Sequence, residues 1–243
     1  MRRLLLISNS TMHGRSYLEH VREALKDHLN GCRSILFVPW ALKDHDAYAD
    51  KAAAAFAELG IRLQSIHRED NVLAAIGAAD AVFVGGGNTF RLLDRLHATG
   101  AAAAIAARAE KGMPYVGSSA GTNVATLSIR TTNDMPIVEP KTFAALGLVP
   151  FQINPHYLDA DPKSTHMGET REERLRQFHE EHDTPVLGLR EGGWLDVRGA
   201  AMRLCGTMKA RLFCRGEAPL EIEPGSDLSF LLKPAVTAGN PTR

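Results

Sequence analysis

The sequence predicts an α/β fold, with a mostly parallel sheet that has helices on both faces. In the first half of the 243-residue chain, short apolar runs alternate with segments of helical periodicity, which is typical of parallel β-α-β units. The run at 81–84 is apolar throughout, as in a strand that is buried on both sides. A hydrophobic content of 44% is enough for one large core. We therefore expect residues 1–235 to form a single α/β domain and 236–243 to form a flexible tail.

Strands are expected to alternate with helices up to residue 117, with two successive helices before the last strand. The predicted strands are 3–8, 34–38, 62–66, 81–84 and 115–117. The predicted helices are 17–29, 46–59, 71–77, 88–98 and 101–111. The first of these helices has Leu18, Val21, Leu25 and Leu29 at helical spacing. Gly60 ends the second helix and Asn71 caps the third.

The second half of the chain is less regular. We expect residues 129–160 to be mostly loop, 168–182 to be a charged helix, and 185–189 to be a strand. Short C-terminal strands are expected around 194–197, 201–204 and 212–214. The apolar run at the N-terminus stops at Ser8, which is too early for a signal peptide, and no run is long enough to span a bilayer.

Charge and cysteine usage exclude several classes of function. The chain has 28 Lys plus Arg and 28 Asp plus Glu with no basic block, so we expect neither nucleic acid nor a membrane as a partner. The three cysteines, Cys32, Cys205 and Cys214, are odd in number and lack C-x-x-C spacing, which favours a reducing cytoplasm. No H-E-x-x-H or comparable cluster occurs, so no metal or cofactor is expected. The sequence leaves both a monomer and a homodimer open.

The segment G-S-S-A-G at 117–121 fits the G-x-S-x-G pattern, with Ser119 at its centre. In that pattern a serine occupies a sharp strand-to-helix turn, and small neighbours let the chain bend. The backbone N–H groups that follow can face a developing oxyanion. An ordinary turn with Ser118 or Ser119 as helix N-cap explains the motif equally well.

A second glycine loop, G-G-G-N-T at 85–89, follows the predicted strand at 81–84. We expect the N–H of Gly87 to be a donor beside the nucleophile. A dinucleotide loop is disfavoured because Phe90 stands where G-x-G-x-x-G needs glycine, and a phosphate-binding G-K-[ST] is absent. A tight turn in which Asn88 caps the next helix is compatible with the oxyanion role.

A nucleophilic serine needs a base, and the base needs a group that orients it. His156 lies in I-N-P-H-Y-L-D at 153–159, where the proline is stiff and apolar neighbours indicate partial burial. Glu191 follows the strand at 185–189 and precedes two glycines. A packed loop histidine and a solvated turn carboxylate are the simpler alternatives. The order Ser…His…Glu argues against an ordinary lipase or esterase.

Together, the glycine loop, the G-S-S-A-G-T-N segment and the I-N-P-H-Y segment resemble peptidase E, the aspartyl dipeptidase family, and Glu191 completes the set. The resemblance implies a flavodoxin-like fold similar to class I glutamine amidotransferases. It implies a Ser119–His156–Glu191 triad and an oxyanion hole from the N–H groups of Gly87 and Ala120. Position 118 departs from the family, which often has a bulky aromatic residue there.

The resemblance also implies a serine-type dipeptidase that forms an acyl-enzyme and takes small peptides with an N-terminal aspartate. An arginine can grip the aspartate carboxylate with two hydrogen bonds, and Arg171 is the expected one. Asp134 is expected to face the substrate ammonium, and Asn88 to be a further substrate contact. A cyanophycinase-like exopeptidase and a non-catalytic small-molecule or nucleotide-binding module are the alternatives.

Overall fold

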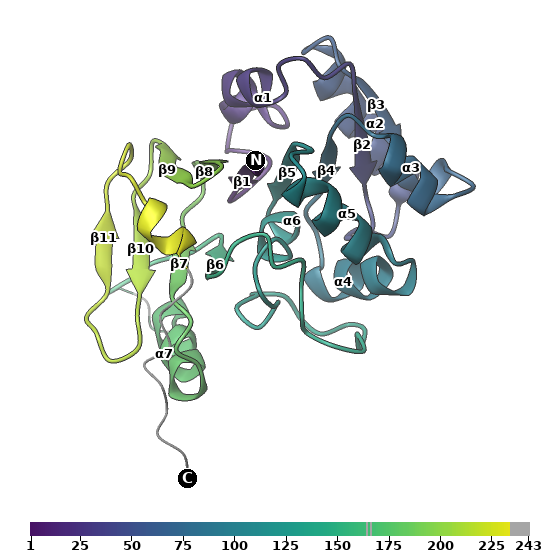
Figure 1. Cartoon of the computed structure of the whole chain (residues 1–243). Coiled ribbons are helices and arrows are strands. Elements are labelled where there is room, and N and C mark those ends of the chain that lie inside the picture. Colours follow the sequence, from purple (N-terminus) through teal and green to yellow (C-terminus); the bar gives the residue numbers. More distant parts are fainter. Residues whose placement is uncertain (164, 166, 234–243) are drawn as a thin grey trace.

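The computed structural model describes residues 1–163, 165 and 167–233, and it confirms the predicted α/β fold class (Figure 1). The larger sheet has seven strands in the order β3-β2-β4-β5-β1-β8-β9. The first five of these strands run parallel, and β8 and β9 are antiparallel to their neighbours. The bounds are β1 Arg3–Ile7, β2 Ser34–Val38, β3 Arg62–Ser65, β4 Val82–Val84, β5 Tyr115–Ser118, β8 Gly193–Arg198 and β9 Ala201–Gly206.

A second sheet has four strands in the order β11-β10-β7-β6. The strands are β6 (Gln152–Pro155), β7 (Val186–Leu189), β10 (Ala210–Phe213) and β11 (Leu220–Ile222). Strands β6 and β7 are parallel, whereas β10 is antiparallel to both of its neighbours. In Figure 1 this sheet lies on the left, at the opposite end of the molecule from β3.

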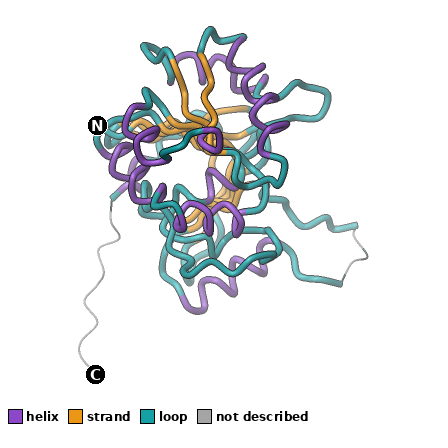
Figure 2. The backbone as a smooth tube through the Cα atoms, turned by 90° about the vertical axis from the view of Figure 1, so that its right-hand side faces the viewer, coloured by secondary structure: helices purple, strands orange, loops and turns teal. Residues whose placement is uncertain are grey.

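The helices of the first half cover both faces of the larger sheet (Figure 2). Adjacent residues of a strand point to opposite faces, and β1 shows the result. Leu5 and Ile7 pack in one core cluster with α1 and α2, and Leu4 and Leu6 pack in another with α3, α4 and α5. The bounds are α1 Arg22–His28, α2 His45–Ala57, α3 Val72–Ala78, α4 Thr89–Ala98, α5 Ala101–Glu110, α6 Ala120–Asn123 and α7 Arg171–Glu181.

Local signals explain where several helices begin. Asn71 caps α3 as predicted, because its side chain accepts a hydrogen bond from the Ala74 N–H at 3.0 Å. Helix α7 begins at Arg171, later than predicted, where Thr170 and Glu173 form a reciprocal capping box. The predicted helix at 17–29 is a short 3₁₀ turn followed by α1.

Three further expectations differ from the structure or fall outside it. Strand β6 lies inside the segment 129–160 that was expected to be mostly loop, and strand β11 was not expected. The helix after Ser119 has only four residues. The predicted tail at 236–243 lies outside the described residues.

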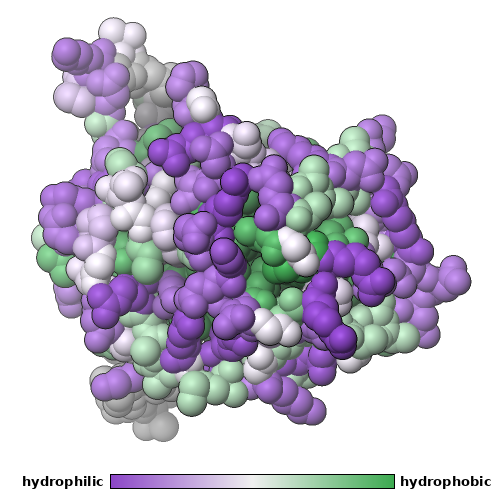
Figure 3. Space-filling model, turned by 90° about the horizontal axis from the view of Figure 1, so that it is seen from above, coloured by the Kyte–Doolittle hydropathy of each residue, from purple (hydrophilic) through white to green (hydrophobic). Residues whose placement is uncertain are grey.

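The face of the molecule that is seen from above is mainly polar (Figure 3). Seen from above, hydrophilic side chains surround a smaller hydrophobic area (Figure 3). Within the described ranges, no helix combines the length and the apolar character needed to cross a bilayer.

Candidate active site

Ser119 occupies the sharp turn between β5 and α6. Its backbone has φ 54° and ψ −112°, a combination that residues other than glycine rarely adopt. The Ser119 N–H donates to the carbonyl of Ile7 on β1 at 3.0 Å, and its carbonyl accepts from Thr122 and Asn123 at 2.9 Å each. These bonds hold the strained turn at the carboxyl ends of the central strands, where open parallel sheets place their ligands.

The glycines of the G-x-S-x-G segment are required by close backbone packing. A Cβ atom on Gly121 would lie 2.0 Å from the carbonyl oxygen of Val84, and one on Gly117 would lie 2.6 Å from the carbonyl oxygen of Gly121. A Cβ on Gly86, in the other glycine loop, would lie 2.9 Å from the Cβ of Ser119. The two glycine loops therefore pack directly against each other at the serine.

His156 follows β6 and reaches Ser119 from the second sheet. Its Nε2 lies 2.8 Å from Ser119 Oγ. The backbone of His156 has a positive φ of 52°, and its N–H donates to Ser8 Oγ at 3.0 Å. Ser8 in turn donates to the carbonyl of Leu189 at 2.7 Å. The buried hydroxyl at the end of β1 thus ties both β6 and β7 to the larger sheet.

Glu191 follows β7 and completes a hydrogen-bonded chain of three groups. Its Oε1 lies 2.6 Å from His156 Nδ1. The next N–H, of Gly192, donates at 2.8 Å to Oδ1 of Asn9, whose side chain is buried. The side chains of His156 and Glu191 are 38% and 49% exposed, so the hydroxyl, imidazole and carboxylate meet at the open surface. This arrangement can transfer a proton from the hydroxyl to the imidazole.

Two backbone N–H groups beside Ser119 are available to an anion. The Gly86 N–H is taken, since it donates to the Tyr48 hydroxyl at 2.8 Å. The N–H groups of Gly87 and Ala120 have no partner in the described part of the chain. Gly87 has φ +132°, and a Cβ on it would lie 2.6 Å from the carbonyl oxygen of Ala41. Only glycine can therefore present its N–H here.

Asp134 and Asn88 are held by α4 and its preceding loop. Oδ2 of Asp134 accepts from the N–H of Thr89 at 2.7 Å and from its hydroxyl at 2.6 Å. The Asn88 side chain accepts from the Arg91 N–H at 3.1 Å, as the predicted helix cap, and donates to the Met135 carbonyl at 2.8 Å. Both side chains thus fix the loop of residues 132–137 against the start of α4.

Arg171 is the first residue of α7 and is half-buried. Burial lowers the pKa of its guanidinium, and the positive charge of Arg174 adds to this effect. The carboxylate of Asp134 acts in the opposite direction. Arg171 forms no ion pair with any described residue. Among those residues, no three metal-ligating side chains lie together.

Ser8, Asn9 and Tyr48 support the site without having been predicted. Ser8 and Asn9 follow the central strand β1, and polar residues at that edge of a parallel sheet are a usable signal. Tyr48 lies in an alanine-rich helix, and nothing in its sequence context shows that its hydroxyl accepts from the glycine loop.

The sequence model of Peptidase family S51 matches residues 4–205. The chain belongs to peptidase family S51. This S51 chain is 58% identical to peptidase E of Streptomyces coelicolor, with 94% of each chain covered. It is 48% identical to a probable alpha-aspartyl dipeptidase of Drosophila melanogaster, covering 96% of this chain and 98% of that one. It is 45% identical to peptidase E of Salmonella typhimurium, covering 91% and 98%.

Two solved structures share the fold of this S51 chain. A putative peptidase E from Listeria monocytogenes superimposes with a TM-score of 0.65 at 24% identity, covering 86% of this chain and 100% of that one. A peptidase from an acI-B1 actinobacterium gives a TM-score of 0.71 at 17% identity, covering 95% and 97%. At such low identity, these likenesses concern the fold alone.

Proposed function

We propose that the protein is a serine-type dipeptidase that hydrolyses dipeptides with an N-terminal aspartate through an acyl-enzyme on Ser119. The observation that carries the proposal is the chain of hydrogen bonds from Ser119 Oγ through His156 to Glu191, at 2.8 and 2.6 Å. It stands beside the free N–H groups of Gly87 and Ala120 in a member of peptidase family S51.

In the proposed mechanism, His156 Nε2 takes the proton from Ser119 Oγ as that oxygen attacks the scissile carbonyl. Glu191 holds the imidazole by Nδ1 and stabilises the imidazolium that forms. The carbonyl oxygen becomes an oxyanion and accepts hydrogen bonds from Gly87 and Ala120. The imidazolium then protonates the leaving amine, and the C–N bond breaks. Water repeats the sequence on the acyl-enzyme and releases aspartate.

Recognition of aspartate is assigned to Arg171, with Asp134 and Asn88 nearby. A guanidinium binds a carboxylate with two parallel hydrogen bonds, and partial burial strengthens such a pair. The half-buried position of Arg171 and the absence of an ion pair to any described residue support this assignment. Asp134 supplies negative charge on the same side for the substrate ammonium. The relative from Drosophila melanogaster is named a probable alpha-aspartyl dipeptidase.

The test is a panel of Asp-Leu, Glu-Leu, Asn-Leu and β-Asp-Arg with the wild type and two variants. Ser119→Ala is expected to lower kcat/KM on Asp-Leu by at least about a thousandfold. Ser118→Ala is the matched control, because this neighbouring buried hydroxyl makes no hydrogen bond to a described residue. A serine-reactive phosphonate is expected to label Ser119.

The same panel distinguishes the alternatives. Undiminished hydrolysis by Ser119→Ala would refute the proposal. Preference for β-Asp-Arg would instead indicate a cyanophycinase-like exopeptidase. Thermal stabilisation by nucleotides without phosphonate labelling would indicate a binding module without hydrolytic chemistry.

The proposal places the enzyme in the cytoplasm, as a monomer or a homodimer. The three cysteines, Cys32, Cys205 and Cys214, are all unpaired, which supports a reducing compartment. Light scattering of the purified chain measures its oligomeric state, and fractionation of the source cells tests the compartment.

A further inference from the structure

A cleft of about 560 Å³ opens beside the proposed nucleophile and base. Ser119 and His156 are among the residues that line it. Tyr17, Leu42 and Tyr48 contribute apolar and aromatic surface to its wall. The cleft runs from the glycine loop to the first turns of α2, so it is large enough and close enough to hold part of a substrate.

The residues assigned to the aspartate do not line the cleft. Arg171, Asp134 and Asn88 are not among the described residues that line it. In the proposed reaction the imidazole of His156 delivers its proton to the leaving amine. A cleft that is lined by both Ser119 and His156, but not by the aspartate-binding residues, therefore lies on the path of the leaving residue.

The cleft has an excess of positive charge. Lys43 and Lys51 line it, and neither forms an ion pair with a described carboxylate. The Lys51 ammonium lies 4.8 Å from the centroid of the Tyr17 ring, which holds the charge at the wall. The acidic residue among the described lining residues is Asp44. Its Oδ1 already accepts a hydrogen bond from the Ala47 N–H at 3.0 Å, as the cap of α2.

We propose that this cleft binds the leaving residue and that Lys43 and Lys51 bind its free α-carboxylate. The inference rests on the proposed function. In a dipeptide, the leaving residue carries a carboxylate immediately after the scissile bond, whereas in a longer peptide that position is an uncharged amide. Two ammonium groups at the wall of the cleft recognise this difference, and the aromatic surface accommodates the side chain. The cleft therefore selects dipeptides over longer peptides.

The experiment compares kcat/KM for Asp-Leu with kcat/KM for Asp-leucinamide, which lacks only the negative charge. The wild type is expected to prefer the acid by about tenfold, as for a hydrogen-bonded charge pair that is partly open to water. In the Lys43→Gln/Lys51→Gln double variant, this ratio is expected to fall to about one. The Lys43→Arg/Lys51→Arg double variant keeps the charges and is expected to keep the preference.

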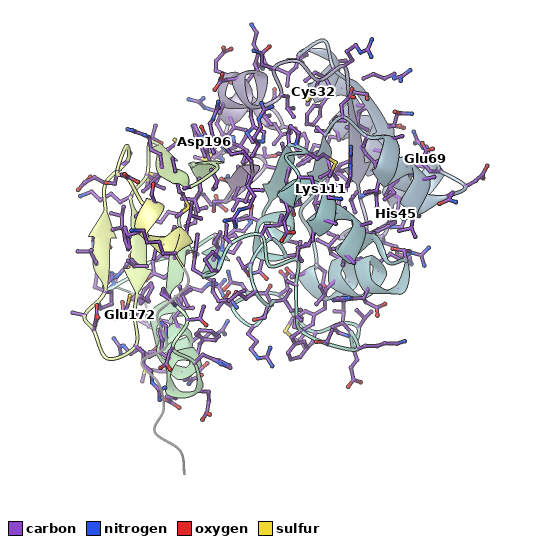
Figure 4. The ribbon with its side chains drawn as sticks, in the orientation of Figure 1. Cys32, His45, Glu69, Lys111, Glu172 and Asp196 are labelled. Carbon is purple, nitrogen blue, oxygen red and sulfur yellow. The ribbon has the colours of Figure 1, made fainter. Side chains whose placement is uncertain are left out.

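Lys111→Gln is the matched control for loss of a surface lysine. Lys111 (labelled in Figure 4) follows α5 and lies before the amino end of β5, whereas Ser119 follows the carboxyl end of that strand. This variant is expected to keep the wild-type ratio. Circular dichroism checks that each variant is folded.

Hydrolysis of Asp-p-nitroanilide separates failure of the inference from failure of the proposed function. This substrate has no leaving-residue carboxylate and reports only on the acyl transfer. If the anilide or amide is cleaved but the wild type does not prefer the acid, the cleft assignment is wrong and the dipeptidase assignment stands. The cleft assignment is equally wrong if the glutamine double variant keeps the wild-type ratio. If none of the aspartyl substrates is cleaved, the proposed function fails and the inference fails with it.

Discussion

His28, the last residue of α1, is buried away from the proposed active site and makes the stability of the fold sensitive to acid. Burial lowers the pKa of its imidazole from 6.5 to about 4. The positive charges of Arg3 and Arg198 contribute to this lowering of the pKa, and the backbone of Tyr115 and the carboxylate of Asp27 act in the opposite direction. The neutral imidazole is therefore the form that the fold accommodates.

The sign and size of the effect of pH on stability follow from the different pKa values of His28 in the folded and unfolded chain. The unfolded chain binds a proton at His28 near pH 6.5, whereas the folded chain binds it only near pH 4. Stability from this residue is therefore fully present above pH 6.5 and is lost as the pH falls toward about 4. Each pH unit of that separation corresponds to about 1.4 kcal/mol, so the total loss is about 3 kcal/mol.

Urea unfolding at a series of pH values from 7.5 to about 4 measures the free energy of unfolding. His28→Leu removes the ionisable group, so its free energy of unfolding should decline less over this range than that of the wild type, by about 3 kcal/mol at the acid end. The exposed His13, replaced in the same way, is the control and should leave the wild-type pH dependence in place. Parallel pH profiles for wild type and His28→Leu would refute the reasoning.

Three further predictions concern the active site. Glu191→Gln keeps the shape of the side chain but removes the charge that stabilises the imidazolium, so kcat on Asp-Leu should fall by about a hundredfold or more, and an unchanged kcat would argue against the relay. Tyr48→Phe leaves the Gly86 N–H without its acceptor, so the free energy of unfolding in urea should fall by about 1–3 kcal/mol. Its kcat should also fall, because the glycine loop shifts. Equal stability of the variant and the wild type would show that this hydrogen bond is dispensable. Gly121→Ala places a Cβ 2.0 Å from a carbonyl oxygen of β4 and should destabilise the fold by about 3 kcal/mol or more. Gly77→Ala is the control and should be tolerated, because the space around Gly77 is open. Similar stabilities of these two variants would contradict the packing argument.

The strands of the larger sheet could be predicted because runs of apolar residues in the sequence indicate that they are buried. Strands β2 and β4 are runs of apolar residues, and their bounds match the prediction within one residue. Strand β6 is different, since Gln152 and Asn154 are polar and yet buried. The side-chain amide N–H of Asn154 donates to the Thr131 carbonyl at 2.7 Å, a partner 23 residues away. No local pattern contains such a contact.

For the candidate site too, the sequence predicts some features and only the fold determines the others. The sequence proposes Ser119 and Glu191 because each follows a predicted strand at the edge where parallel sheets bind ligands, and it proposes His156 because of the stiff, apolar segment around it. Their distances depend on how β6 and β7 dock against β1, and Ser8 contributes to that docking through partners 148 and 181 residues away. A serine at the end of an apolar run does not reveal these partners.

The serine comes from one sheet, and the imidazole and carboxylate come from the other. The proposed reaction centre therefore lies at the junction of the two sheets. A separation of roughly 1 Å between the two sheets would lengthen the 2.8 Å contact between Ser119 and His156 beyond hydrogen-bonding range while leaving each sheet intact. The turnover rate is therefore more sensitive to a change in the docking of the two sheets than any spectroscopic signal of secondary structure.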